Sequence, residues 1–322
     1  MRALWRLLGF STITVGGSLA SARALSALHI TPASGTPRLL VLGAVSALVA
    51  LAGVWLAGRV LDRRRLGDFG LRLSRAWIED ALFGMLLGGF LMAGVFLVEW
   101  GAGWVAVRDT LARGDSEGGF AGAVATLLGV LIFVGFYEEL LSRGYLLRNL
   151  AEGLRSRYLG PRVALWLATL VSSALFGLLH ADNPNATLLS SAAVSCAGVL
   201  LALGFLLTGR LALPIGLHVT WNFFQGVVFG FPVSGIRTLG AQVLVLELGG
   251  PPAWTGGPFG PEAGLVGLGA MATGCLLIFA WVRWRHGALA VHVGMLEPPQ
   301  LRHSSPDPGL PHPAGEGATL ES

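Results

Sequence analysis

The chain has 322 residues, of which 53% are hydrophobic and only 12% are charged. An ordinary soluble domain carries about 25% charged residues, so this composition, with a mean hydropathy of +0.68, argues against a soluble globular protein and favours a membrane protein. The net charge is +4 and all 22 basic residues are arginines. These arginines lie mostly between apolar segments, which is typical of topology signals and argues against a nucleic-acid partner.

Eight apolar stretches are each close to the roughly 20 residues that a helix needs to cross the hydrocarbon layer. The first stretch also resembles a cleaved signal peptide, because a basic start precedes an apolar run and small residues. We interpret it as a membrane span and keep the cleaved signal as the alternative. The predicted spans are 4–22, 38–58, 80–100, 120–147, 162–180, 186–208, 211–231 and 262–282.

The arginines indicate how the spans are oriented. If the spans alternate in direction, the main arginine clusters fall on one side, which we predict to be cytoplasmic together with both termini. The protein would then be a multi-pass protein of a plasma or inner membrane, with the lipid bilayer as its surroundings. These arginines are Arg59, Arg63, Arg64, Arg65, Arg72, Arg75, Arg148, Arg155, Arg157, Arg162, Arg210, Arg283 and Arg285.

The domain organisation follows from the same pattern. Residues 1–296 are predicted to form a single transmembrane domain. Residues 297–322 are polar and rich in proline, so they cannot bury enough apolar area to fold, and we predict that they are disordered.

The most informative feature is a pair of adjacent acids, Glu138 and Glu139, in the fourth span. A charge within a membrane helix costs about 3 kcal/mol on insertion scales, so the pair indicates either a function or a strong local partner. Arg143 follows Glu139 by one turn, so these two residues share a helix face and can pair. Glu138 points about 100° away and has no cation one turn on. We therefore predict a structural Glu139–Arg143 pair and assign Glu138 to chemistry.

Two later spans add polar residues at helical spacing. The fifth span ends with Phe176 and His180, and the seventh holds His218 and Asn222. Taken singly, each has an ordinary structural explanation, such as an interfacial histidine or an amide bonded between helices. Together with Glu138 they form the set that water-activating hydrolysis needs. A carboxylate can take a proton from water, an imidazole can polarise a carbonyl or protonate an amine, and an amide can donate to an oxyanion.

The ordered motifs EExxxR, FxxxH and HxxxN, each on its own predicted helix within residues 120–231, resemble the CPBP family of intramembrane proteases. This family includes the type II CAAX prenyl endopeptidases and the abortive-infection proteins. The resemblance implies an all-α polytopic transmembrane bundle of about eight helices, with a polar intramembrane cavity open to the cytoplasm. It also implies hydrolysis of a peptide bond near the C-terminus of a membrane-associated protein or peptide.

The resemblance also implies a role for each motif residue. Glu138 would activate water with the help of His180, and His218 and Asn222 would stabilise the oxyanion. The supporting residues would be Glu139, Arg143 and Phe176.

Two mechanisms stay open at this point. Glu138, His180 and His218 could supply a zinc site with a vacant position for water. The same residues could instead act without a metal, with Glu138 as the base.

Two other functions remain as alternatives. A non-proteolytic membrane scaffold or bacteriocin-immunity protein would keep the fold without the chemistry. A transporter is ranked lower, because the span 186–208 contains serines but no ionisable group.

A question of depth accompanies the proposed site. Glu138 lies ten residues before Arg148, about 15 Å along a helix, and His180 lies nineteen residues after Pro161, about 28 Å. A tilt, an extension of the fifth span or a re-entrant shape would remove this difference. We predict that one of these occurs and that Glu138, His180 and His218 lie within about 8 Å of one another.

Overall fold

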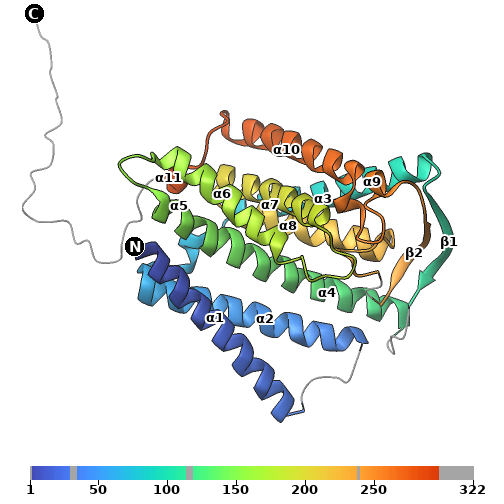
Figure 1. Ribbon diagram of the computed structural model, residues 1–322, viewed down its shortest axis with the longest axis horizontal. Coiled ribbons are helices and arrows are strands. Elements are labelled where there is room, and N and C mark those ends of the chain that lie inside the picture. Colours follow the sequence, from blue (N-terminus) through green and yellow to red (C-terminus); the bar gives the residue numbers. More distant parts are fainter. Residues whose placement is uncertain (1, 30–34, 114–118, 238–239, 297–322) are drawn as a thin grey trace, which may run out of the picture.

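The computed structural model describes residues 2–29, 35–113, 119–237 and 240–296 (Figure 1). It is an all-α bundle, with one two-stranded sheet at the end away from α5 and α11. The predicted tail 297–322 lies outside the described residues. The long helices are α1 (Arg2–Ala27), α2 (Gly35–Ala57), α3 (Arg75–Gly101), α4 (Gly119–Glu139), α6 (Pro161–Leu178), α7 (Leu188–Thr208), α8 (Ala212–Asn222) and α10 (Leu265–His286).

Shorter elements connect or extend these helices. Three are π-helical: η1 (Gly58–Asp62), η3 (Leu140–Leu147) and η4 (Phe223–Val228). Two are 3₁₀ turns, η2 (Leu66–Phe69) and η5 (Pro261–Ala263). The short α-helices are α5 (Arg148–Leu154), α9 (Pro252–Thr255) and α11 (Val293–Leu296).

The eight predicted spans all coincide with helices. Six helical segments of the described chain are long and apolar enough to cross a membrane. The helices α1 and α8 are not among these six; α8 has only 11 residues and its π-helical continuation six. The protein is thus an integral, multi-pass membrane protein. Its exposed surface is apolar along the helices, as at Leu86 and Phe90 of α3.

Helix α8, which carries the third motif, packs against α3 through glycines. A Cβ atom at Gly84 of α3 would lie 2.2 Å from the Leu213 carbonyl oxygen, and one at Gly216 of α8 would lie 2.3 Å from the Ala81 carbonyl oxygen. The two backbones therefore touch directly. This contact fixes the height and rotation of α8 relative to the rest of the bundle.

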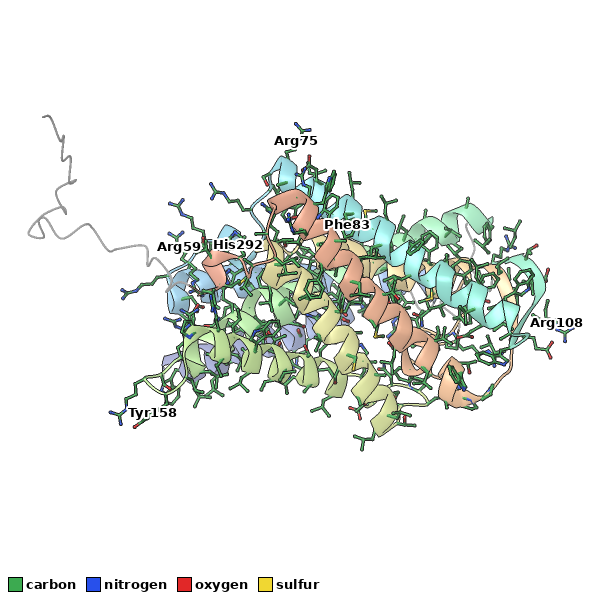
Figure 2. All side chains as sticks on the ribbon, turned by 90° about the horizontal axis from the view of Figure 1, so that it is seen from above. Arg59, Arg75, Phe83, Arg108, Tyr158 and His292 are labelled. Carbon is green, nitrogen blue, oxygen red and sulfur yellow. The ribbon has the colours of Figure 1, made fainter. Side chains whose placement is uncertain are left out.

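The sequence did not predict the sheet. Strands β1 (Val105–Ala112) and β2 (Gln242–Leu248) are antiparallel, with Val105 opposite Leu248. The sheet draws together two connections that are far apart in the chain. Arg108 of β1 lies at the opposite end of the molecule from Arg59 and Tyr158 (Figure 2).

The arginine-rich end contains a buried network. Tyr145 of η3 donates a 2.7 Å hydrogen bond to Asp62 of η1, and Arg6 lies 3.4 Å from the same carboxylate. Arg64, which the sequence suggested as a topology signal, is 4% exposed and pairs with Glu152. Arg64 therefore also links the connection between η1 and η2 to helix α5.

The structure answers the question of depth in an unexpected way. The fourth helix does not end near Arg148, because α4, η3 and α5 form one helical stretch that runs to Leu154. Glu138 therefore lies sixteen residues from the end of that stretch, about 24 Å at 1.5 Å per residue. This is close to the roughly 28 Å for His180, so the length of the fourth helical stretch alone removes the difference.

Candidate active site

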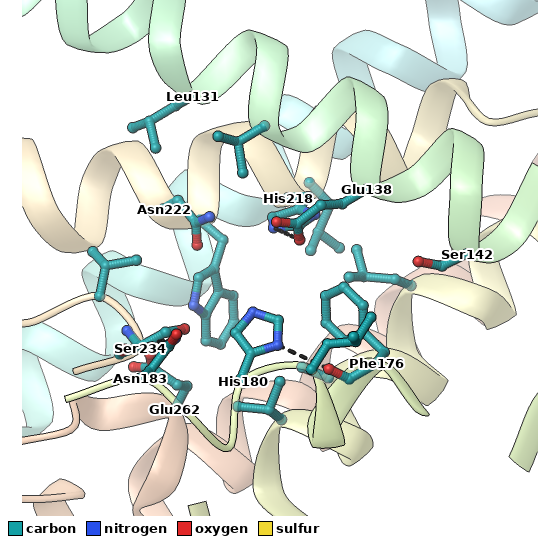
Figure 3. A pocket seen from close by; sticks show the side chains of 18 of the residues that line it. Leu131, Glu138, Ser142, Phe176, His180, Asn183, His218, Asn222, Ser234 and Glu262 are labelled. Atoms are coloured by element: carbon teal, nitrogen blue, oxygen red, sulfur yellow. Dashed lines mark hydrogen bonds and ion pairs between the residues drawn. The ribbon is translucent and has the colours of Figure 1, made fainter. Parts of the chain in front are cut away.

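One cavity of about 540 Å³ brings the three motifs together (Figure 3). Glu138 enters it from α4, His180 from the turn after α6, and His218 and Asn222 from α8. Most of the remaining lining is apolar, with side chains such as Leu200 from α7. The chemistry-bearing residues that the sequence suggested thus share one apolar-walled cavity.

His218 lies between the two adjacent acids. Its Nδ1 is 2.9 Å from Glu139 Oε1, and its Nε2 is 3.8 Å from Glu138 Oε2. Because a carboxylate only accepts hydrogen bonds, we assign the Nδ1 proton as donated to Glu139. This orientation turns Nε2 of His218 towards Glu138 and the cavity.

The predicted pair between Glu139 and Arg143 is present. Arg143 donates a 2.7 Å hydrogen bond to Glu139, and the two side chains are 1% and 0% exposed. Arg143 also donates to the carbonyl of Gly198 in α7 at 3.1 Å. The sequence missed that the same Glu139 oxygen also holds His218. Glu139 therefore does more than neutralise Arg143, because it orients a side chain of the cavity.

Phe176 connects the first motif to both histidines. The Arg143 guanidinium carbon lies 4.3 Å from the centre of the Phe176 ring, a cation–π contact. The His180 ring centre is 4.9 Å and the His218 ring centre 6.1 Å from the same ring. The phenyl group thus sets the spacing between the Glu139–Arg143 pair and the imidazoles.

His180 is held by the end of its own helix. Its Nδ1 lies 2.8 Å from the Phe176 carbonyl oxygen, so the Nδ1 proton is assigned to that bond. The other ring nitrogen, Nε2, then points into the cavity, as Figure 3 shows. Both histidines therefore present Nε2 to the same space.

A second polar group lines the same cavity, and the sequence reading missed it. The Ser234 amide donates a 2.6 Å hydrogen bond to Glu262, and Asn183 donates a 2.9 Å bond to the Ser234 carbonyl. Burial raises the pKa of Glu262 to about 7. The signal in the sequence was a lone acid at the first position of the last predicted span. These bonds fix the turn 233–236, which forms one wall of the cavity.

The donor set does not fit a zinc site. In the part of the chain that the structure describes, no group of three or more His, Cys, Asp or Glu side chains is arranged to hold a metal ion. Glu138, His180 and His218 share the cavity without converging on one metal position.

The fold and the cavity define a polytopic membrane protein with a hydrolase-like set of polar groups inside the bundle. Residues 120–224 match the family model described as type II CAAX prenyl endopeptidase Rce1-like. For this segment of the chain, the match confirms the resemblance to the CPBP family of intramembrane proteases. No curated protein and no protein of solved structure matches the chain.

The matched segment covers all three motifs and ends before the wall 233–236. The match supports a CAAX-type intramembrane endopeptidase in general.

Proposed function

We propose that the protein hydrolyses a peptide bond of a membrane-associated protein or peptide, with Glu138 as the general base. The observation that carries this proposal is that one cavity is lined by four polar residues of the matched segment, Glu138, His180, His218 and Asn222. No step of the proposed mechanism runs through a metal, since the donor set does not fit one.

The first step is attack by water. In this step His218 lies between the two acids with both ring nitrogens protonated, so a water molecule can accept a hydrogen bond from its Nε2 and donate one to Glu138 Oε2, which lies 3.8 Å from that nitrogen. Glu138 takes one proton from this water while the oxygen attacks the peptide carbonyl. His180 Nε2, unprotonated because Nδ1 donates to Phe176, can accept a hydrogen bond from the same water.

The second step is collapse of the tetrahedral intermediate. The Asn222 amide donates to the oxyanion, as does His218 when its ring is protonated on both nitrogens. Glu138 returns its proton to the leaving amine as the carbon–nitrogen bond breaks. The products are a new carboxyl terminus and a free amine, and Glu138 is ionised again.

The walls of the cavity suggest the kind of substrate. They include Val130, Leu131 and Val134 of α4, Leu201 of α7 and Met271 of α10. An apolar segment next to the scissile bond would bury its side chains there, at about 25 cal/mol per Å². We therefore propose a substrate with small or medium aliphatic residues beside the cleaved bond, near its C-terminus.

The test is a cleavage assay with the full-length protein in lipid vesicles. The reporter is a membrane-tethered peptide with an aliphatic C-terminal segment, and the released fragment is identified by mass spectrometry. Glu138→Gln should slow cleavage by about 10²- to 10⁴-fold, the usual contribution of general acid–base catalysis. The matched control is Glu79→Gln, a partly exposed acid paired with Arg75 and Arg285 and not among the cavity residues, and this variant should cleave at the wild-type rate.

Metal dependence is measured in the same assay. Cleavage should continue after exhaustive chelation, and the active protein should contain no stoichiometric zinc. Loss of activity that added zinc restores would reject the metal-free mechanism. Wild-type rates in Glu138→Gln would reject the assignment of the base.

A further inference from the structure

A second cavity, of about 450 Å³, lies beside the sheet. Its walls come from the end of α3, the end of β2 and the glycine- and proline-rich segment that follows β2. It shares no lining residue with the proposed active site, although the chain segment 231–237 contributes to both cavities. Its volume is in the range of small-molecule sites.

A buried acid, Glu99, lines this second cavity. The Glu99 residue is 1% exposed, and its Oε1 has no hydrogen-bond partner among the described residues. It lies in the last turn of α3, where the carbonyl ends of the helix add further negative potential. A buried acid in this position requires a cation, a hydrogen-bond donor or its own proton to offset the desolvation of the carboxylate.

The walls around Glu99 offer few donors. Four lining residues, Pro232, Pro252, Pro258 and Pro261, have no amide hydrogen. The amide of Gly249 already donates to the Trp104 carbonyl at 2.7 Å. The hydroxyl of Thr255 lies 3.3 Å from the Pro251 carbonyl and donates to it. Apart from the side chains of Asn185 and Arg237, these walls therefore present mainly acceptors, and a ligand can supply the donor that Glu99 lacks.

We propose that the second cavity binds a ligand with a primary ammonium group, such as a lysine side chain or the amino terminus of a peptide. The ammonium group would pair with Glu99 and donate to the carbonyl groups of the walls, while the rest of the ligand fills the cavity. A metal ion is a poorer match, because no group of three or more suitable donor side chains exists in the described chain. The site stands apart from the proposed hydrolysis and does not depend on it.

Arg237 offers a rival explanation. It lines the cavity from an exposed position, and a rearranged side chain could pair with Glu99 inside the protein. If Arg237 were the natural partner, a cationic ligand would bind only after this arginine is removed. The two explanations therefore predict opposite effects for Arg237→Gln.

The experiment measures binding of Nα-acetyl-lysine methylamide to the full-length protein in detergent micelles by calorimetry. The neutral comparison is Nα-acetyl-norleucine methylamide, which lacks only the ammonium group. The wild type should bind the lysine derivative at least tenfold more tightly than the norleucine derivative. Glu99→Gln should abolish this preference, while Glu99→Asp and Arg237→Gln should keep it.

Glu247→Gln is the matched control. It removes an exposed acid from β2 at the same end of the molecule, and it should leave the preference unchanged. Equal binding of both compounds by the wild type, no binding of either, or a preference that persists in Glu99→Gln would overturn the proposal. A preference that arises only in Arg237→Gln would also overturn it, in favour of an internal pair. If Glu99→Gln fails to fold, the proposal is still tested by the binding of the lysine and norleucine derivatives to the wild type and to Glu99→Asp.

Discussion

Substitution by glutamine should have different effects at the adjacent acids Glu138 and Glu139. It should lower the free energy of unfolding at Glu139, and at Glu138 it should lower the cleavage rate with little effect on stability. Glu139 is fully buried and accepts hydrogen bonds from Arg143 and His218, whereas the Glu138 side chain is 22% exposed. Removing one partner of a buried ion pair costs about 3–5 kcal/mol, because it leaves the other charge uncompensated. A partly exposed side chain outside such a pair costs about 1 kcal/mol or less.

Glu139→Gln keeps an acceptor oxygen, so we expect the lower end of that range, about 3 kcal/mol, and Glu139→Leu the upper end. The lower figure corresponds to a roughly 100-fold change in the folding equilibrium. Glu138→Gln should leave the free energy of unfolding within about 1 kcal/mol of the wild type. It should nevertheless slow cleavage by about 10²- to 10⁴-fold, because the proposed base is lost.

A double substitution sharpens this prediction. Glu139→Leu combined with Arg143→Met replaces the buried pair by apolar side chains of similar length. It should restore most of the lost stability, since neither charge is left buried alone. Cleavage should stay low, because His218 has lost the acceptor of its Nδ1 proton.

The assay is reversible unfolding in mixed detergent micelles, followed by tryptophan fluorescence, with the cleavage assay run on the same preparations. Equal destabilisation by Glu138→Gln and Glu139→Gln would refute the reasoning. So would a double variant that is less stable than Glu139→Leu alone.

Three further predictions test other parts of the site. Asn222→Ala should lower kcat by about 10²- to 10³-fold with little change in KM, the usual loss for one oxyanion donor; an unchanged kcat in the cleavage assay would remove Asn222 from the mechanism. Because the pKa of Glu262 is raised to about 7 from 4.5, the folded chain holds this proton more tightly than the unfolded chain does. The free energy of unfolding should therefore fall as the pH rises from about 4.5 to 7, by at most about 3 kcal/mol, and unfolding titrations should show no such fall in Glu262→Gln. Gly88→Ala should destabilise the protein by about 1–3 kcal/mol, because its Cβ would lie 2.5 Å from the Leu217 carbonyl oxygen. Gly94→Ala on the same helix meets no atom within 4 Å and should be neutral or stabilising by up to about 1 kcal/mol.

The sequence predicted the helices well because an apolar stretch long enough to cross a membrane is a strong signal. All eight predicted spans coincide with helices, and the Glu139–Arg143 pair was predicted from spacing alone. A pair at i and i+4 depends on the geometry of one helix, so it needs no knowledge of the fold.

What the sequence did not predict depends on contacts between distant segments. The bond from His218 to Glu139 joins residues that are 79 positions apart, and no local pattern reveals it. The sheet likewise joins two connections that each read as an ordinary loop. The GxxxG pair at Gly84 and Gly88 was visible, but such pairs are common by chance in a chain with 47 glycines. Only the structure shows that α8 packs directly against these two residues.

Two of the three helices that carry motif residues change to π-helical winding directly after a proposed site residue. The α-helical turns of α4 end at Glu139, before η3, and those of α8 end at Asn222, before η4. A wider turn holds one more residue than an α-turn needs, so its removal would rotate all that follows by about 100°. Within η3 such a deletion would leave both acids in place and turn Tyr145 away from Asp62. The extra residue of the π-turn thus fixes how the cavity residues are rotated relative to the residues of the arginine-rich end. A one-residue deletion in this turn should therefore destabilise the protein more than most single substitutions do.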